Sequence, residues 1–269
     1  MKLTIPFEKM HGLGNDFVII SEEAVPGDIS KEQLAVIIAD RKLGIGCDQF
    51  ITYEKYDGFI KMSIYNHDGS IAKACGNASR CLSRLIFEQT GKQDIILDVQ
   101  GRKVTCRYHN SAQIKVNMGA VSFKEKWMPN KDQLWSLAQK YMIEPKEMMC
   151  VDVANPHLVI FTKLSDQDQK IIGRNFQNLD LFPTGINVNF AKIEDNRIYL
   201  KVWERGAGFT YACGSGAVAT FAAAHQLGFT DSEAEVMFKL GSLKMFKDKE
   251  CINMTGPASS ILHGEYIYG

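Results

Sequence analysis

The chain has 269 residues, 45% of them hydrophobic, and its 31 basic and 31 acidic residues give a formal net charge of zero. This balance leaves no basic surface for nucleic acid or for an anionic membrane, so we expect a small polar substrate instead of either partner. The N-terminus has no secretory signal, and no run approaches the roughly 18 apolar residues of a membrane helix, which predicts a cytoplasmic protein.

The first half of the chain is predicted to form strands interrupted by two helices. A helix is expected over 31–42, because Ser30 and Gln33 have the spacing of a capping box at its start. A second helix is expected over 77–91, where apolar residues recur at helical spacing and Gly91 suits a C-cap. The strands, predicted from β-branched and aromatic runs between Gly, Asp and Asn breakers, cover 5–9, 17–20, 50–53, 59–65, 95–99, 104–108 and 113–118.

The second half is predicted to repeat this plan. Its last helix, over 215–228, has an alanine-rich interior against which strands can pack closely. We therefore expect an N-terminal domain over 1–117, to which 262–269 return, and a C-terminal domain over 118–261. The other predicted elements are a helix over 134–142, strands over 158–161, 188–193 and 198–203, and short strands that end at 268.

Two near-identical tripeptides, Ala74-Cys75-Gly76 and Ala212-Cys213-Gly214, lie about half a chain apart, each before a predicted helix. A thiol at a helix start faces unpaired N–H groups and a partial positive charge, which favour the thiolate. The matched positions suggest that the two thiols share one proton-transfer reaction.

The chain has seven cysteines, an odd number that suits a reducing compartment better than a disulfide framework. Cys75 and Cys81 are six residues apart, which is not the spacing of a structural zinc site, so we expect no metal. The cysteines outside the two tripeptides are expected to be core residues: Cys47, Cys81, Cys106, Cys150 and Cys251.

Seven ordered segments give the chain a resemblance to the diaminopimelate epimerase family, cofactor-independent enzymes of bacterial and plant lysine synthesis. The resemblance covers nearly the whole length and implies an α+β fold of two similar, pseudo-symmetric domains. Each domain would be a barrel-like β wrap around a central helix, with the active site in the cleft between them. The matching segments are 9–17, 44–49, 66–70, 74–77, 155–157, 185–190 and 204–208 leading to 213–216.

The resemblance implies catalysis by Cys75 and Cys213. Inverting an amino-acid α-carbon needs a base on one face and an acid on the other, and one thiolate with one thiol supplies both without a pyridoxal cofactor. The carboxylate would meet backbone N–H groups of Gly76, Asn77, Gly214 and Ser215. Asn15 and Gln49 would hold the reacting ammonium; Asn66, Asn155, Asn187, Glu204 and Arg205 would hold the distal end; His157 and Glu204 would tune the proton affinity of the thiols.

Two departures from the family pattern keep alternatives open. Phe209 stands where the family usually has a glutamate, so a cofactor-independent racemase of the same fold, acting on histidine or proline, is an alternative. Leu262 replaces a tyrosine associated with the family's dimer, although a homodimer is still expected. From a different class, a binding protein that kept the amino-acid site without turnover is the remaining alternative, against which both cysteines argue.

Overall fold

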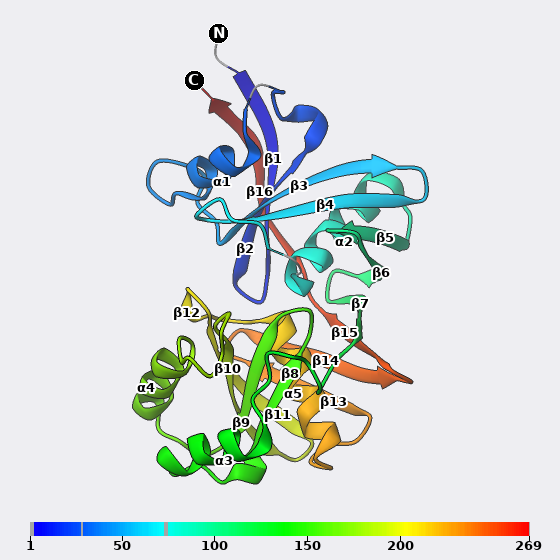
Figure 1. Cartoon of the computed structure of the whole chain (residues 1–269). Coiled ribbons are helices and arrows are strands. Elements are labelled where there is room, and N and C mark those ends of the chain that lie inside the picture. The colour runs from blue at the N-terminus through cyan, green and yellow to red at the C-terminus, as the bar shows by residue number, and fades with distance from the viewer. Residues whose placement is uncertain (1–2, 28, 73–74, 269) are drawn as a thin grey trace. The chain divides into compact units, whose positions relative to one another are not determined.

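The computed structural model describes residues 3–27, 29–72 and 75–268, so Ala74 lies outside the described residues (Figure 1). The chain divides into two units, Met1–Asn117 with Thr255–Gly269, and Met118–Met254. It leaves the first unit within β7 (Gln113–Ala120) and returns within β15 (Cys251–Gly256). As independently folding domains, these units remain a prediction.

The return to the first unit begins earlier than the expected 262, because the last strand is long. β16 (Ser259–Tyr268) pairs antiparallel with β1 (Leu3–Gly12), from Leu3 opposite Tyr268 to His11 opposite Ser259. The residues 255–261, expected in the second domain, therefore belong to the first unit. This pairing also places the start of β1 beside the end of β16 (Figure 1).

The strands of the first unit follow one another in the order β16-β1-β2-β3-β4-β5-β6-β7. Neighbours are antiparallel except β2 with β3 and β4 with β5, which are parallel and need a crossover. α1 (Lys31–Ala39) and α2 (Gly76–Thr90) lie in these two crossovers. The remaining elements are β2 (Asn15–Ser21), η1 (Glu22–Ala24), β3 (Gln49–Tyr56), β4 (Phe59–Asn66), β5 (Asp94–Val99) and β6 (Arg102–Asn110).

The second unit has the strand order β15-β14-β13-β11-β10-β9-β8, with β12 paired to β11. Its parallel pairs are β9 with β10 and β11 with β13, and α4 (Asp166–Phe176) and α5 (Gly214–Gln226) lie in their crossovers. The other elements are α3 (Lys131–Lys140), η2 (Pro145–Glu147), β8 (Met148–Asp152), β9 (Pro156–Phe161), β10 (Asn187–Glu194), β11 (Arg197–Glu204), β12 (Gly208–Phe209), β13 (Glu233–Phe238) and β14 (Gly241–Asp248).

The two strand orders match element for element, with β1 to β7 of the first unit repeated by β8 to β11 and β13 to β15 of the second. α1 corresponds to α4, and α2 to α5. α2 packs against β1, β2, β5 and β6, and α5 against β8 to β11, β13 and β14. This confirms the expected α+β class and the repeated plan.

α2 has the expected ends, whereas α5 ends at Gln226, two residues before the predicted 228. α2 begins after Cys75, which has extended backbone, and ends at Gly91, whose φ of 73° and N–H bond to Phe87 O make a left-handed cap. α5 follows Cys213 in the same way, and its ten buried residues include five alanines. Small side chains let strands pack close to α5, as the composition predicted.

Three sequence predictions are corrected. The first helix ends at Ala39, not 42, because Asp40 is extended and its carboxylate accepts from the N–H groups of Lys42 and Leu43. α3 starts before 134, because Asn130 and Gln133 form a capping box. α4 was not predicted. Among the described residues, no helix combines the length and hydrophobicity needed to span a bilayer.

Candidate active site

Cys75 is the N-cap of α2 and is half-buried, whereas Cys81 of α2 and Cys106 of β6 are buried. Burial raises the pKa of Cys81 and of Cys106 to about 12, so both stay protonated. The Cys75 thiol lies 3.9 Å from Asn15 Oδ1, at the limit of a sulfur hydrogen bond. Cys75 therefore combines a helix start with partial exposure, which are two conditions for a reactive thiol.

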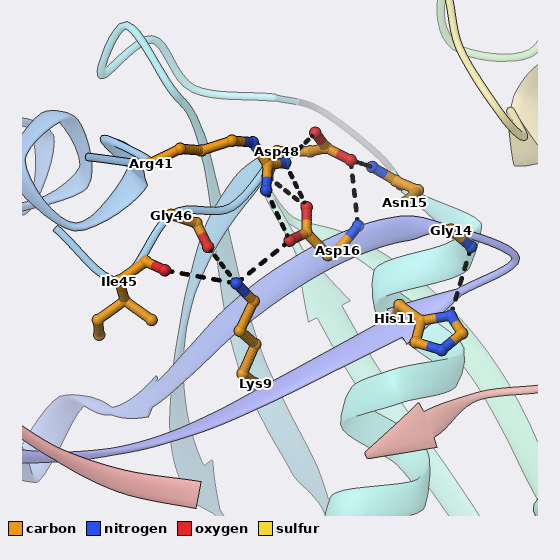
Figure 2. A network of polar contacts seen from close by, with 9 residues as sticks. All are labelled: Lys9, His11, Gly14, Asn15, Asp16, Arg41, Ile45, Gly46 and Asp48. Atoms are coloured by element: carbon orange, nitrogen blue, oxygen red, sulfur yellow. Dashed lines mark hydrogen bonds and ion pairs between the residues drawn. The ribbon is translucent and has the colours of Figure 1, made fainter. Parts of the chain in front are cut away.

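The amide of Asn15 is oriented by a charged network at the start of β2 (Figure 2). Asn15 Nδ2 donates to Asp48 Oδ2 at 2.9 Å, and Arg41 Nη2 donates to Asp48 Oδ1 at 2.8 Å. Because the amide nitrogen is held by Asp48, the carbonyl oxygen Oδ1 faces Cys75 and accepts from Asn77 Nδ2 at 3.3 Å. An acceptor in that place suits an ammonium group.

Arg41 also anchors Asp16, the residue after Asn15. Its guanidinium binds both carboxylate oxygens of Asp16, at 3.1 and 2.7 Å, and Lys9 Nζ lies 3.5 Å from the same carboxylate (Figure 2). Burial opposes ionisation of Asp16, but the hydrogen bonds from Arg41 outweigh it and lower its pKa. The support beneath Asn15 is thus ionic and rigid.

Gln49 and Asn66 face each other across β3 and β4, where they are register partners. Gln49 Nε2 donates to Asn66 Oδ1 at 2.9 Å, and Asn66 Nδ2 donates to Ser70 Oγ at 3.0 Å. The segment after Asn66 is a turn closed by Gly69 N to Asn66 O, at 2.9 Å. The Asn-His-Asp-Gly-Ser segment is therefore a turn that also orients a polar side chain, as predicted.

Cys213 has the same position on α5, in a different environment. Its sulfur accepts from Gly216 N at 3.4 Å and lies 3.5 Å from Ser215 Oγ. Burial and then the carboxylate of Glu204 raise the pKa of Cys213 well above its usual value, outweighing the contacts with Ser215 and Gly216. The expectation that a helix start makes a thiolate is wrong for Cys213 in this state, because burial and a neighbouring negative charge are stronger.

His157 is completely buried, and the Ser215 hydroxyl links it to Cys213. His157 Nε2 lies 3.0 Å from Ser215 Oγ and 3.1 Å from Asn155 Oδ1, and Nδ1 lies 3.1 Å from Asn189 Nδ2. Burial lowers the pKa of His157 to about 4, although the hydrogen bond with Asn189 opposes the shift. The ring is therefore neutral near pH 7. A neutral imidazole can share a hydrogen bond with the Ser215 hydroxyl and so orient it toward Cys213.

The remaining candidates of the second unit surround Asn187. Asn187 Oδ1 accepts from Arg205 N at 3.0 Å, and its Nδ2 donates to Pro156 O at 2.9 Å. The Arg205 guanidinium donates to the carbonyl of Thr184, and Glu204 accepts from Thr210 Oγ1 at 2.5 Å. Glu204 and Arg205 thus have separate partners and do not simply neutralise one another.

Strand register relates the candidates of one unit to those of the other. Phe17 pairs with Gln49, and His157 pairs with Asn187 in the equivalent parallel pair. Phe17 and His157 therefore hold the same position in the two units. Asn15 and Asn155 each lie two residues before them, so these two asparagines are also equivalent.

The same comparison continues at the strand ends and the helix starts. Asn66 ends β4, and Glu204 ends the equivalent strand β11. Cys75 and Cys213 are the N-caps of α2 and α5. The candidates therefore occupy equivalent positions in two copies of one plan, with different charges.

The other cysteines mostly follow the core prediction. Cys47, Cys81, Cys106 and Cys150 are buried, and burial raises the pKa of Cys47 and Cys150 to about 12. Cys251 is the correction, since it is half-buried on β15. Within the described ranges, no three His, Cys, Asp or Glu side chains are grouped so as to hold a metal ion.

Sequence reasoning missed three residues that orient the candidates. Asp48 directly precedes Gln49 and binds Asn15; Asn189 binds His157; Arg80 binds Asn77. Asn189 lies two residues after Asn187 on β10, so strand alternation could have indicated it. For Asp48 and Arg80 the sequence holds no comparable signal, since charged residues are usually exposed.

The chain matches the family model described as diaminopimelate epimerase over residues 7–124 and 149–261. The chain belongs to the diaminopimelate epimerase family. It is 55% identical to a protein named diaminopimelate epimerase from Rickettsia felis over 97% of each chain, and 55% identical to one from Rickettsia bellii over 99% of each. The epimerases of this family are isomerases, and the family assignment made from the sequence is confirmed.

Solved structures share the fold at low sequence identity. A predicted epimerase from Pseudomonas aeruginosa matches with a TM-score of 0.76 at 11% identity, covering 98% of this chain and 100% of that one. A hydroxyproline epimerase from Agrobacterium vitis, solved with bound trans-4-hydroxy-L-proline, matches with a TM-score of 0.67 at 10% identity, covering 99% and 94%. These matches establish the fold that the diaminopimelate epimerase family shares with them.

Proposed function

We propose that the chain interconverts LL-2,6-diaminopimelate and meso-diaminopimelate by two-base proton transfer at one α-carbon, with Cys75 and Cys213 as the two groups. The observation that carries the proposal is the equivalent placement of both cysteines as N-caps of α2 and α5 in a repeated plan. An epimerase runs in both directions, so its acid and base exchange roles and are best provided by like groups in like positions. Family membership supports diaminopimelate as the substrate.

The reaction balances without a cofactor. One cysteine, as thiolate, takes the α-proton and becomes a thiol, and the C–H electron pair stays on the α-carbon as a carbanion delocalised into the carboxylate. The other cysteine, as thiol, gives its proton to the opposite face and becomes a thiolate. Configuration inverts at that carbon, and the reverse reaction begins from this exchanged protonation state.

The carbanion is the costly species, because an amino-acid α-proton is weakly acidic. Backbone N–H groups at the first turns of α2 and α5 would stabilise the charge that develops on the carboxylate, donated by Gly76, Asn77, Gly214 and Ser215. Asn15 Oδ1, turned outward by Asp48, would accept from the reacting ammonium together with Gln49. The distal zwitterion would meet Asn66, Asn155, Asn187, Glu204 and Arg205.

Glu204 and His157 would set the resting protonation of Cys213. Negative charge on Glu204 and burial favour the thiol form of Cys213. Neutral His157 reaches the same sulfur through the Ser215 hydroxyl, which lies 3.0 Å from His157 Nε2 and 3.5 Å from Cys213 Sγ. A resting thiol at Cys213 leaves Cys75 to act first as the base.

The substrate is tested by hydrogen exchange in deuterium oxide with LL-diaminopimelate, proline and histidine under full reduction. We expect α-proton exchange and inversion only with diaminopimelate, followed by proton NMR and chiral chromatography. Exchange with proline or histidine alone would assign the chain to the racemase alternative, which Phe209 keeps open. Binding of diaminopimelate without exchange would support the binding protein instead.

The roles of the two thiols are tested by Cys75→Ala and Cys213→Ala, with Cys150→Ala as a buried control outside the site. We expect each site variant to lose inversion by a factor of about 10² to 10⁴, the range of general acid–base catalysis, while circular dichroism shows the fold intact. A site variant that turns over at the wild-type rate would remove that cysteine from the mechanism.

We also propose that the protein is a cytoplasmic homodimer. The cytoplasm would keep both thiols reduced, which the mechanism needs. Leu262, on the exposed strand β16, is 45% exposed and stands where the resemblance places a tyrosine of the dimer. Light scattering after gel filtration gives the oligomeric state, and a monomeric mass at micromolar concentration would reject the dimer.

A further inference from the structure

Arg80 is a fully buried cation in the second turn of α2. It has no exposed surface and heads the fully buried side chains by volume. Moving a guanidinium out of water costs several kcal/mol unless charges or hydrogen bonds compensate. A cation in such a place therefore has a role that an apolar residue cannot fill, and the equivalent position of α5 is the apolar Val218.

The guanidinium is held at the Cys75 end of α2. Nη2 donates to Asn77 Oδ1 at 2.9 Å, and Nη1 lies 3.5 Å from the carbonyl oxygen of Gly76, the residue after Cys75. Nε donates to Pro257 O at 2.9 Å, on the segment that leads into β16. Gly12 of β1 closes the cage, since a Cβ there would lie 2.9 Å from Nη2.

These contacts also determine which way the amides near Cys75 point. Arg80 occupies Asn77 Oδ1, so Asn77 donates through Nδ2 to Asn15 Oδ1 at 3.3 Å. Asp48 occupies the amide nitrogen of Asn15 from the other side. One cation and one anion therefore orient the two amides, and the Cys75 thiol is a donor to Asn15 Oδ1 at 3.9 Å. This weak contact favours the neutral thiol, so any preference for the thiolate has to come from positive charge.

We propose that Arg80 is a positioning residue for Cys75, holding the first turn of α2 and favouring the thiolate of Cys75 through its buried positive charge. The inference rests on the proposed role of Cys75 as a base, and it assigns to Arg80 the stabilisation of the thiolate that this role needs. In the second unit, Val218 replaces the cation and Glu204 adds a negative charge, so the two equivalent thiols differ in resting protonation.

The mutual influence of Arg80 and the thiols agrees with this placement. Burial lowers the pKa of Arg80 to about 10, and the negative charges of Cys81, Cys75 and Cys106 as thiolates oppose the shift. Attraction is reciprocal, so Arg80 favours ionisation of the same three thiols. Cys81 and Cys106 are buried and stay neutral, which leaves the half-buried Cys75 as the thiol that responds.

Other charges on the elements packed against α2 are mostly paired. On β1 and β2, Lys9 and Asp16 pair with each other, and Arg41 also binds Asp16. His11 on β1 accepts from Gly14 N, Tyr108 on β6 stacks on Phe87 of α2, and Cys106 on β6 is buried. On β1, burial raises the pKa of Glu8, and the carboxylate of Glu88 on α2 adds to the shift. The remaining ion pairs of β5 and β6 are Asp98 with Lys103 and Asp94 with Arg107.

The test measures the alkylation rate of Cys75 by iodoacetamide against pH, read by peptide mass spectrometry in the full-length Cys213→Ala protein. Arg80→Gln removes the charge and keeps hydrogen-bonding capacity, whereas Arg80→Lys keeps the charge. Arg84→Gln is the matched control, because Arg84 lies one turn later on α2 and donates to the carbonyl of Ala258 at 2.8 Å.

We expect Arg80→Gln to raise the alkylation midpoint by about one pH unit, and so to slow alkylation about tenfold below the midpoint. Arg80→Lys and Arg84→Gln should keep the wild-type midpoint. An unchanged midpoint in folded Arg80→Gln would overturn the proposal, since a merely structural role would lower thermal stability without moving the pH profile.

If Arg80→Gln does not fold, the proposal is tested in proteins that keep Arg80. In Cys213→Ala, Cys75 should be alkylated with a midpoint below the ordinary cysteine value of about 8.5, and in Cys75→Ala the midpoint of Cys213 should lie above it. A Cys75 midpoint at or above that value overturns the proposal. These readouts do not depend on turnover, so failure of the proposed epimerase activity would be seen separately.

Discussion

Cys75 and Cys213 occupy equivalent positions with different charged neighbours. Both are N-caps, but the first lies near a buried arginine and the second near a glutamate. The helix start supplies only partial charges, worth about 0.3–1 kcal/mol at a typical site, whereas a full charge in a buried site is worth more. In the proposed mechanism, this difference lets the pair begin a turnover as one thiolate and one thiol.

His157 provides the residue-scale test of this electrostatic description. Its pKa in the folded protein is about 4, below the usual 6.5, so between these values the unfolded chain binds the extra proton. The stabilising contribution is present above the unfolded pKa and is lost as pH falls toward the folded pKa. We expect the free energy of unfolding to decrease by about 2 kcal/mol from about pH 7 to about pH 5 on account of His157.

The measurement is urea denaturation of the wild type and of His157→Asn across this pH range. The variant should be less stable at neutral pH and should lose less stability on acidification, because it has no imidazole to protonate. Equal pH slopes for the two proteins would contradict a buried, neutral His157. The exposed-residue control is His67→Asn, in the turn after Asn66.

At the scale of elements, α5 depends on close approach by its surrounding strands. Gly216 lies in its first turn, and a Cβ there would lie 2.8 Å from Asn189 Oδ1 and 2.9 Å from Val202 Cγ2. Real Cβ atoms almost never approach other atoms so closely. The same glycine N–H reaches Cys213 Sγ, so packing and the thiol's environment are coupled at one residue.

Gly216→Ala should therefore destabilise the protein by about 1–3 kcal/mol, the usual effect of overpacking a core. Gly27→Ala is the control, because a Cβ at Gly27 meets nothing within 4 Å. Thermal and urea denaturation of both variants measure the difference. A Gly216→Ala protein as stable as the Gly27→Ala protein would show that the strands beside α5 can move apart freely.

At the scale of the whole molecule, the proposed chemistry requires one catalytic cysteine from each unit. Each unit contributes one cysteine, and two groups that serve one carbon must both reach it. An amino-acid α-carbon is small, so the two sulfurs need to approach one another during turnover. Their oxidation would then join them and consume both thiols.

We expect mild oxidation with diamide to link Cys75 to Cys213 and to abolish epimerisation, and dithiothreitol to restore it. Non-reducing peptide mapping by mass spectrometry identifies the bond, and Cys150, which is buried, is the thiol expected to remain unmodified. Oxidised protein in which these two cysteines are never joined would argue against a shared carbon.

Local sequence was enough to predict both cysteine helices, the turn after Asn66 and the repetition of the first half's plan, although β8 and α4 were not predicted. Caps, glycines and alternating side chains act over a few residues, so their effect is present in the sequence itself. The binding candidates came from the family resemblance instead, and the structure places Asn15, Gln49 and Asn187 each at the first residue of a strand.

The amino-acid sequence by itself determined the family, the paired cysteines and the α+β plan. Only the tertiary structure decided how the pairs differ: Arg80 is buried beside Gly76 and Asn77, and Glu204 lies beside Cys213. It also decided where β16 returns to β1. Charge acts through distance and burial, and strand pairing joins segments far apart in the chain, so neither is expressed in the neighbouring residues that a sequence pattern compares.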